Sequence, residues 1–292
     1  RFRLAHVRFG REIIEVATFR ASATHSHEDA HQDEEGRIIR DNVYGSVDED
    51  VWRRDFTCNA LYYNIADFSI WDYTGGVQDI RDRQIRLIGE AEQRLREDPV
   101  RMLRAIRFAA KLDFDIAEDV VESIHANAEL LTNVPAARLF DEFLKLFQAG
   151  NAEKTFLLLR EHKLFAQMFP ATEAEIVGDA AFLNFIMAAL RNTDRRVASG
   201  KSVTPMFLLG VFLWAPTRRL AADLRSREKM SESQSLSLAS YELCAEQQRR
   251  IANPRRITVP MREMLAMQPR FTVTRGKRAM NFLEHRRFRA AY

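Results

Sequence analysis

The chain has 292 residues, of which 46% are apolar and 29% are charged, a balance typical of folded globular domains. The length allows about two domains, and no apolar run approaches the ~20 residues that a membrane-spanning helix needs. Cys58 and Cys244 are too few and too far apart for a disulfide framework or a zinc site, so we expect a reducing, cytoplasmic setting. No Met or signal peptide opens the chain, so we expect it to begin inside a longer protein.

The net charge of +3 is unevenly distributed along the chain. Residues 249–292 carry eleven Arg and one Lys against two Glu, a local balance of +10, so the remaining residues sum to −7. Phe271, Phe282, Phe288 and Tyr292 are interleaved with these basic residues. Positive charge combined with stacking aromatic rings suits single-stranded RNA, whereas the plainer alternative is a solvated helix surface.

The first part of the chain predicts a small β-structure. Residues 2–9 and 12–18 have the alternation and β-branched composition of two strands, joined at Gly10-Arg11. Residues 21–40 have no periodicity and predict a loop. Glu15 interrupts the apolar second strand, so its carboxylate either faces solvent from a sheet edge or coordinates a cation.

A helix is predicted from Ser46, because Ser46-Val47-Asp48-Glu49 fits a capping box, and we expect it to continue through Leu61. Asp55 and Asn59 are four residues apart and would share one helix face. These two side chains could bind a ribose hydroxyl and phosphate oxygens, with Arg54 as a positive counter-charge. An amphipathic helix with a charged outer side explains the same pattern equally well.

Further strands are expected at residues 67–73 and 84–88, on either side of Gly75-Gly76. Paired glycines after a strand indicate a tight turn that needs a positive φ.

The segment from Glu97 to Phe108 has a well-marked helix start. Pro99 suits the first helical position, and Asp98 falls at the N-cap, where its carboxylate can accept from free amides. Arg101, Arg104 and Arg107 follow at helical spacing. An acceptor beside an arginine donor matches the base edges of adenine and cytosine rather than those of guanine and uracil. Ordinary ion pairs on a surface helix are the plainer alternative.

From residue 97 onward strand signals largely vanish and apolar clusters recur at helical spacing. The pattern weakens at residues 172–203, where we expect a loop or a domain joint. A small sheet followed by helices predicts an α+β fold with segregated parts.

Together these segments resemble the class II nucleotidyltransferases, which comprise bacterial poly(A) polymerases and CCA-adding enzymes. The resemblance rests on five segments that keep the family order, and the opening and the end of the chain look like the poly(A) polymerase branch. The five segments are Ile14 to Arg20, Arg53 to Leu61, Asp72 to Asp79, Glu97 to Arg107, and Pro135 to Leu146.

The resemblance implies a role for each matched residue. Glu15 matches the third carboxylate of a site for two Mg²⁺ ions. Arg54, Asp55 and Asn59 match the segment that holds the sugar and phosphates of the nucleotide. The base would be read by Asp98 and Arg101, assisted by Arg104 and Arg107. A hinge is implied at Asp72 and Gly75-Gly76, and a stabilising pair at Arg138 and Glu142.

The same resemblance implies a partial nucleotidyltransferase head at residues 1–94, a helical neck at 95–150 and a helical body at 151–292. It implies transfer of AMP from ATP to RNA 3′ ends, with Arg275, Lys277 and Arg278 contacting RNA. The glycine-rich turn and the Asp-x-Asp pair that precede Glu15 in the family are absent from this sequence, so activity is expected only of the complete protein. Two alternatives stay open, a CCA-adding tRNA nucleotidyltransferase and a non-catalytic RNA-binding homologue.

Overall fold

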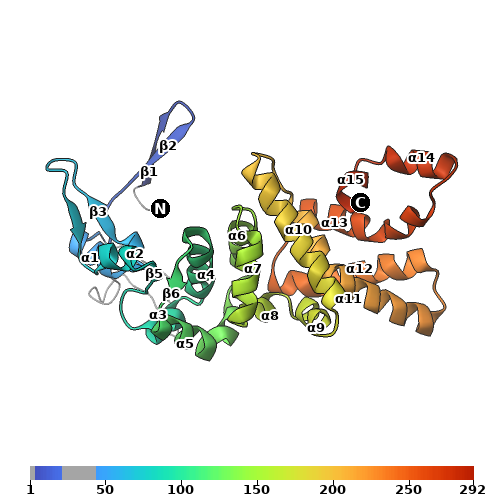
Figure 1. Cartoon of the computed structure of the whole chain (residues 1–292), viewed down its shortest axis with the longest axis horizontal. Coiled ribbons are helices and arrows are strands. Elements are labelled where there is room, and N and C mark those ends of the chain that lie inside the picture. Colours follow the sequence, from blue (N-terminus) through green and yellow to red (C-terminus); the bar gives the residue numbers. More distant parts are fainter. Residues whose placement is uncertain (1–3, 22–43) are drawn as a thin grey trace. The chain divides into compact units, whose positions relative to one another are not determined.

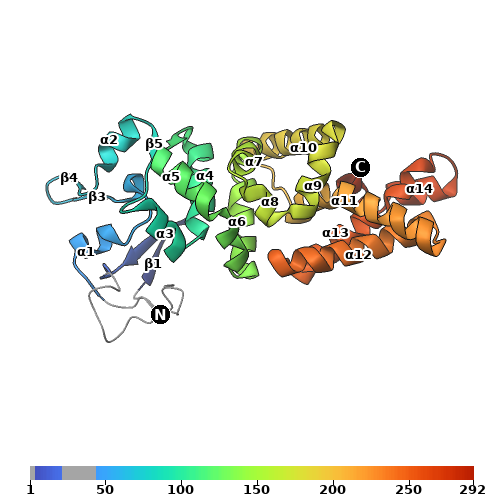
Figure 2. The same cartoon turned by 90° about the horizontal axis from the view of Figure 1, so that it is seen from below.

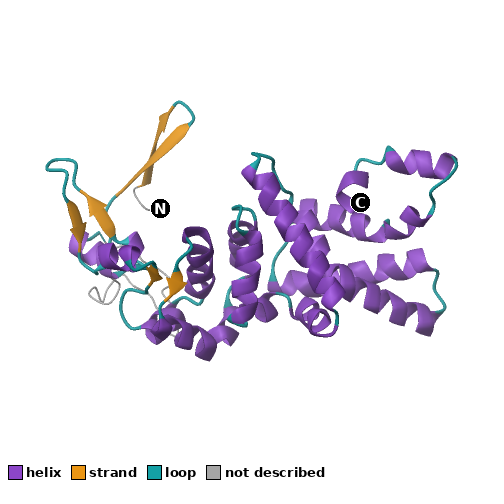
Figure 3. Cartoon of the chain, in the orientation of Figure 1, coloured by secondary structure: helices purple, strands orange, loops and turns teal. Residues whose placement is uncertain are grey.

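The computed structural model of the chain describes residues 4–21 and 44–292 (Figure 1). The chain divides into two compact units, Arg1–Leu130 and Leu131–Tyr292. Within the described residues every strand lies in the first unit, and the second unit is helical (Figure 3). This arrangement confirms the predicted α+β fold, while the division into head, neck and body stays a prediction. The loop predicted at residues 21–40 lies outside the described residues except for Ala21.

The chain begins with the predicted hairpin. Strand β1 (Leu4–Phe9) pairs antiparallel with β2 (Glu12–Ala17), and Leu4 lies opposite Ala17. The hairpin turns at Gly10, whose φ of 62° favours glycine. Both strands are exposed along their whole length.

Helix α1 (Val47–Trp52) begins at the predicted capping box of Ser46 and Glu49, but it ends much earlier than expected. The prediction of a helix through Leu61 is wrong, because Thr57–Asn59 form a 3₁₀ turn, η2, and Leu61–Tyr63 form strand β3. Phe56 has extended backbone and is fully buried opposite Leu87. Burial of its ring outweighs the local preference for helix.

Strand β3 pairs antiparallel with β4 (Ile70–Asp72), and a tight turn leads into α2 (Gly76–Arg81). The carboxylate of Asp72 holds this turn by accepting hydrogen bonds from the backbone N–H groups of Thr74, Gly76 and Val77 at 2.9–3.1 Å. Gly75 has a φ of 79°, as the paired glycines predicted. Burial alone would raise the pKa of Asp72, but these hydrogen bonds together lower it.

A short parallel pair completes the strands of the first unit. Strand β5 (Gln84–Ile85) pairs with β6 (Asp115–Ile116), which the sequence did not predict. Helices α3 (Ala91–Glu97), α4 (Val100–Leu112) and α5 (Glu118–Asn127) follow β5 and enclose the core of the unit. Its largest fully buried side chains are Phe56, Ile85, Leu95, Met102, Leu103 and Ile106.

Helix α4 starts one residue later than predicted. Pro99 is the residue before the first helical position, although its φ of −61° and ψ of −20° are already helical. Asp98 has extended backbone, and its carboxylate accepts from the N–H of Val100 at 3.2 Å. The predicted capping interaction of Asp98 is therefore present, although the helix begins one residue later than predicted.

The second unit consists of helices joined by short connections, and α11 and α12 lie side by side in both views (Figures 1 and 2). A 3₁₀ turn, η3 (Ala128–Asn133), runs between the two units. The elements of the second unit are α6 (Ala136–Phe147), α7 (Ala152–Glu161), α8 (Leu164–Met168), α9 (Pro170–Gly178), α10 (Ala180–Ala198), α11 (Pro205–Glu228), α12 (Glu232–Arg250), α13 (Arg255–Ala266), η4 (Gln268–Thr272), α14 (Lys277–Leu283) and α15 (Phe288–Ala291).

The loop or joint predicted at residues 172–203 is mostly wrong, because most of this segment is helical in α9 and α10. Six alanines between residues 171 and 189 explain the weak pattern. Alanine is the strongest helix former, yet it contributes little to an apolar periodicity.

The core of the second unit is aromatic. Phe212 of α11 lies within 5.0–6.4 Å, between ring centroids, of five other phenylalanine rings, those of Phe143, Phe147, Phe156, Phe165 and Phe169. All six side chains are fully buried. One ring thus joins four helices, α6, α7, α8 and α11, with the residue that follows α8.

We expect that replacing Gly76, in the turn before α2, destabilises the first unit. A Cβ atom at Gly76 would lie 2.3 Å from the backbone oxygen of Thr57, so Gly76→Ala must displace η2. We expect a loss of about 1–3 kcal/mol in the free energy of unfolding of the first unit, measured by denaturant titration.

Gly178→Ala, in α9 of the second unit, is the control for the change of residue type and is read from the unfolding of that unit, because nothing lies within 4 Å of the added methyl group. It should be neutral or slightly stabilising, since alanine favours helix. Equal stabilities of the Gly76→Ala variant and the original protein would contradict the close approach.

Candidate nucleotide site

The turn that carries Asp55 is fixed by backbone pairing with the segment after β5. The N–H of Ile88 donates to the carbonyl oxygen of Asp55 at 3.0 Å, and the N–H of Thr57 donates to that of Arg86 at the same distance. The hydroxyl of Thr57 also donates to Asp79 at 2.7 Å. These contacts place the side chains of Asp55 and Asn59 through a 3₁₀ turn rather than on a helix face.

The carboxylate of Asp55 joins two predicted site residues that lie 45 positions apart in the chain. One oxygen, Oδ1, accepts from the amide of Asn59 at 3.2 Å, and the other accepts from Nε of Arg104 at 2.5 Å. The Asp55 side chain is only 14% exposed, so this ion pair is shielded from water. The structure therefore brings Asp55, Asn59 and Arg104 together as one hydrogen-bonded group.

A second acidic residue, Asp50, organises Arg54, and the sequence analysis missed it. The buried Asp50 carboxylate accepts from Nη2 of Arg54 at 2.8 Å and from the hydroxyl of Tyr62 at 2.9 Å. Nε of Arg54 also donates to that hydroxyl at 2.8 Å. The i,i+4 spacing of Asp50 and Arg54 was the available signal.

Several guanidinium groups surround this carboxylate. The pKa of Arg53 falls to about 10, first because the group is buried and then because it lies near the charges of Arg20, Arg54 and Arg94. Arg94 is itself largely buried and donates to the carbonyl oxygens of Arg53 and Arg54. Such a concentration of positive charge suits an anion with several oxygens, such as a triphosphate.

Arg101 was predicted to bind the edge of a nucleotide base, but in the structure its partner is a carboxylate of the same chain. Its Nη1 donates to Glu97 at 3.0 Å and to the carbonyl oxygen of Arg94 at 2.6 Å, and the side chain is 11% exposed. Glu97 also accepts from Arg94 at 2.8 Å. Arg101 thus lies beside the arginine cluster, where it is held by Glu97.

The remaining arginines of α4 flank an aromatic ring. The guanidinium carbons of Arg104 and Arg107 lie 5.3 and 4.5 Å from the ring centroid of Phe108, which is half-buried. The same ring contacts Phe56 edge to face at 5.5 Å. Phe108 therefore connects the arginine face of α4 to the buried turn, a role that the sequence analysis did not assign to it.

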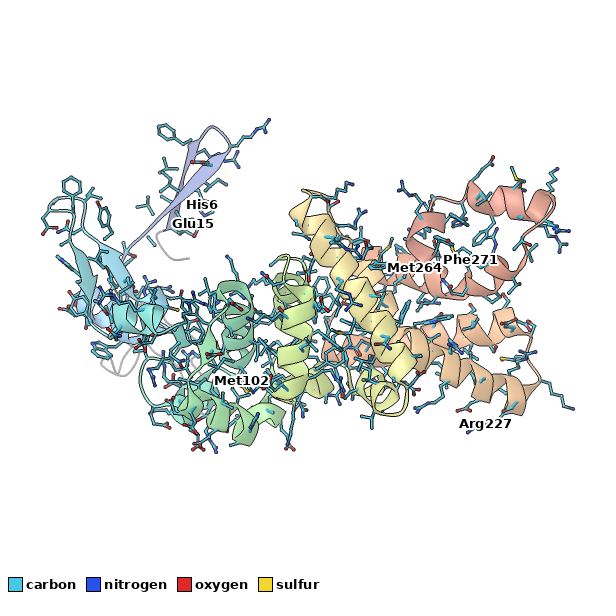
Figure 4. The ribbon with its side chains drawn as sticks, viewed as in Figure 1. His6, Glu15, Met102, Arg227, Met264 and Phe271 are labelled. Carbon is cyan, nitrogen blue, oxygen red and sulfur yellow. The ribbon has the colours of Figure 1, made fainter. Side chains whose placement is uncertain are left out.

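Glu15 lies apart from any cluster of metal ligands that the structure describes. Its side chain is 68% exposed and lies 3.5 Å from Nε2 of His6, its cross-strand neighbour on the hairpin (Figure 4). Within residues 4–21 and 44–292, no three His, Cys, Asp or Glu side chains are grouped so that they could hold a metal ion. One exposed carboxylate does not make a Mg²⁺ site, so the described residues alone do not fit that ion.

The basic end of the chain differs in part from the prediction. Arg275, Lys277 and Arg278 are exposed around the start of α14, and no ion pair is found for them in the part of the chain that the structure describes. The interleaved phenylalanines do not form a free stacking surface. Phe271, labelled in Figure 4, packs against Phe282 and Phe288 at 4.7 and 5.4 Å between centroids, and Phe282 is buried.

One further observation concerns the whole described chain. Among its helices, none combines the length and the apolar character that crossing a bilayer requires.

The sequence analysis also expected a stabilising pair at Arg138 and Glu142 on α6. In the structure, Glu142 is buried and its carboxylate accepts from Lys145 at 2.8 Å.

Three family descriptions match successive parts of the chain. "Poly A polymerase head domain" matches residues 1–86, "Probable RNA and SrmB- binding site of polymerase A" matches 113–176, and "Polymerase A arginine-rich C-terminus" matches 228–292. The predicted site residues Glu15, Arg54, Asp55 and Asn59 fall in the first of these matches. The basic residues Arg275, Lys277 and Arg278 fall in the last.

The chain is similar over its whole length to curated bacterial proteins. It is 45% identical to the poly(A) polymerase I of Salmonella typhimurium and 44% identical to that of Escherichia coli O157:H7, and it spans 64% of the length of each. A CCA-adding enzyme of Staphylococcus aureus is 37% identical over 163 residues, which cover 56% of this chain and 39% of that enzyme.

Solved structures support the fold. A CCA-adding enzyme in its apo form aligns with 94% of this chain, has 59% of its own length covered, and gives a TM-score of 0.57 at 20% identity. A tRNA nucleotidyltransferase complexed with a primer tRNA and an ATP analogue aligns with 99% of this chain and 75% of its own, with a TM-score of 0.55 at 20% identity.

The buried carboxylate of Asp50 predicts a large stability effect. In Asp50→Asn, Arg53 and Arg54 lose their shielded counter-charge, so we expect a loss of roughly 3 kcal/mol in the free energy of unfolding of the first unit. Denaturant titration at neutral pH measures it. Asp115→Asn, an exposed change of the same type, should stay within about 0.5 kcal/mol of the original protein. Equal effects of the two substitutions would show that Asp50 does not hold the arginine cluster.

Proposed function

Because the chain belongs to the bacterial poly(A) polymerase family of class II nucleotidyltransferases, we propose that the complete protein adds AMP from ATP to RNA 3′ ends without a template. The proposal depends on one observation above all. Asp55, Asn59 and Arg104 form a shielded hydrogen-bonded group beside a cluster of arginines, in a chain that is similar over its whole length to poly(A) polymerases I.

The arginine cluster is proposed to bind the triphosphate of ATP. Arg54 is oriented by Asp50 and Tyr62, and Arg53, which shares the Asp50 carboxylate, would gain a second counter-charge that offsets its repulsion from neighbouring arginines. Asp55 and Asn59 would bind the ribose, whose hydroxyl groups can donate to a carboxylate and accept from an amide. In this way the chain orients the α-phosphate for attack by the RNA 3′ hydroxyl, with pyrophosphate as the leaving group.

The base of ATP is proposed to lie against α4. Asp98 and Arg101 would bind the amino group and the ring nitrogen of adenine, with Arg104 and Arg107 assisting beside the Phe108 ring. In this proposal the adenine edge takes the place that Glu97 holds as a partner of Arg101. The exchange leaves the Asp55–Arg104 pair intact.

Further parts of the proposal come from the family. When bound, two Mg²⁺ ions would supply activation of the attacking hydroxyl and neutralisation of the leaving charge. We propose Glu15 as one ligand of that metal site, and the fact that the chain spans 64% of its relatives' length leaves room for other ligands in the complete protein. Arg275, Lys277 and Arg278 are proposed to bind RNA phosphates. A cytoplasmic location agrees with this role.

The test uses the complete protein with labelled ATP or CTP, and with either a generic RNA or a tRNA that lacks its terminal nucleotides as primer. Long A tails on the generic RNA are expected. Incorporation of CTP confined to tRNA ends would instead identify a CCA-adding enzyme, like the Staphylococcus aureus relative of that name. RNA binding without incorporation of either nucleotide would identify a non-catalytic homologue.

Removing the Asp98 carboxylate predicts a change in base selectivity. For Asp98→Ala in the complete protein, the ratio of kcat/KM for ATP to that for GTP and UTP should fall by roughly tenfold, because the acceptor for the amino group is lost. Steady-state incorporation assays measure it. Asp115→Ala, in the same unit, should leave the ratio unchanged. An unchanged ratio in Asp98→Ala would mean that the base is read elsewhere.

Replacing Glu15 separates a catalytic role from a structural one. Glu15→Gln in the complete protein should lower kcat by about 100-fold or more, because the metal loses an anionic ligand, while RNA affinity changes little. The control is Glu12→Gln, an exposed position on the same strand and on the opposite face of the hairpin. Equal losses of turnover and of RNA affinity would point to a folding role for Glu15.

A further inference from the structure

Two adjoining cavities lie in the second unit, between α11 and the elements around α13. The larger has a volume of about 470 Å³ and the smaller about 350 Å³. Trp214 of α11 and Gln268 of η4 line both, so the two cavities are neighbours that share these two side chains, and together we call them the groove. A volume in this range is typical of pockets that hold small ligands, and a nucleotide is of that size.

The larger cavity is aromatic. Phe185, Phe207, Trp214 and Tyr292 line it, and they come from α10, α11 and the residue that follows α15. The Phe185 side chain is 45% exposed, unlike the buried rings of the core. Flat, accessible rings are the surfaces on which unpaired nucleobases stack, whatever the base.

The floor of the larger cavity depends on a close approach of two helices. At Gly210, an added Cβ atom would lie 2.1 Å from Cε of Met264 on α13, a residue labelled in Figure 4. Because Gly210 has no side chain, the cavity stays open at this point of its lining. Gln268 is oriented at its rim, because its amide donates to the carbonyl oxygens of Met264 and Ala291.

The smaller cavity is basic. Arg218 and Arg225 line it, and their separation of seven residues places both on the same face of α11. Among the described residues no ion pair is found for either, and Glu232 is the one acidic residue in the lining. The Arg218 guanidinium lies 5.8 Å from the centroid of the Trp214 ring, at the border between the two cavities.

We infer that this groove is a binding site for single-stranded RNA, with a base in the aromatic cavity and backbone phosphates at Arg218 and Arg225. Positive charge next to accessible rings matches the alternation of phosphate and base along a single strand, but not a duplex, whose bases are paired. The inference deepens the proposed function and depends on it, because it assigns part of the RNA substrate to the helical body.

The experiment measures binding of the complete protein to labelled oligo(A) and to an abasic strand with the same number of phosphates. Phe185→Ala should weaken oligo(A) binding by roughly 5- to 100-fold, the range for loss of one stacked base, and should leave abasic binding unchanged. Phe185→Leu keeps an apolar side chain without the ring and should show the same loss, so a folding defect would not explain it.

The charged half of the groove has its own matched pair of variants. The double variant Arg218→Gln, Arg225→Gln should weaken the binding of both oligo(A) and the abasic strand. It should also reduce the slope of log affinity against log salt by about 1.4, at roughly 0.7 per phosphate contact. Arg227→Gln with Lys229→Gln makes the same charge change at exposed positions at the end of the same helix, outside both cavities, and should leave the slope nearly unchanged. Neutralising Arg275, Lys277 and Arg278 should also weaken the binding of both oligo(A) and the abasic strand.

A direct signal comes from Trp214. With Trp214 as the only tryptophan of the complete protein, oligo(A) should quench its fluorescence and the abasic strand should not. Equal affinities of Phe185→Ala, Phe185→Leu and the original protein for oligo(A), or no response of Trp214, would overturn the inference and favour a protein segment as the occupant. In that case normal A-tail synthesis would leave the proposed function standing.

Discussion

The first unit depends on one shielded ion pair, between Asp55 and Arg104. It joins a turn that follows α1 to a helix that begins 45 residues later, and it does so at the edge of the core formed by Phe56 and Phe108. Neither group could be buried alone, because an unpaired charge costs several kcal/mol when it leaves water. The pair therefore sets the position of α4 against the turn, and with it the position of Asp98 and Arg101 relative to the arginine cluster.

Much of this arrangement follows from local sequence signals. The hairpin at Gly10, the capping box at Ser46 and the turn at Gly75 each depend on residues within a few positions of one another, and each was predicted from that pattern. The grouping of Asp55 with Asn59 was also predicted, although for the wrong reason, since a 3₁₀ turn and not a helix joins them. The base-reading roles of Asp98 and Arg101 rest on the family resemblance and stay predictions.

The features that the sequence analysis missed are long-range. Nothing near Phe56 indicates that it pairs with Leu87, and burial of that ring ends the helix that local propensity favours. Tyr62 meets Asp50 only because β3 folds back beside α1. In the second unit, the phenylalanines near the end of the chain look like an RNA surface in sequence but pack against one another, while Phe185 and Trp214, which drew no attention, line a cavity.

The crowding of Arg53 among other guanidinium groups has a practical consequence. The pKa of Arg53 falls to about 10 first because the group is buried and then because neighbouring guanidinium groups repel its charge, and a multivalent anion bound beside these groups would offset that repulsion. Sulfate, inorganic phosphate or pyrophosphate in a purification buffer would then raise the melting temperature of the first unit and compete with nucleotide at the same time. Preparations made in different salts would differ in apparent substrate affinity without any difference in the polypeptide.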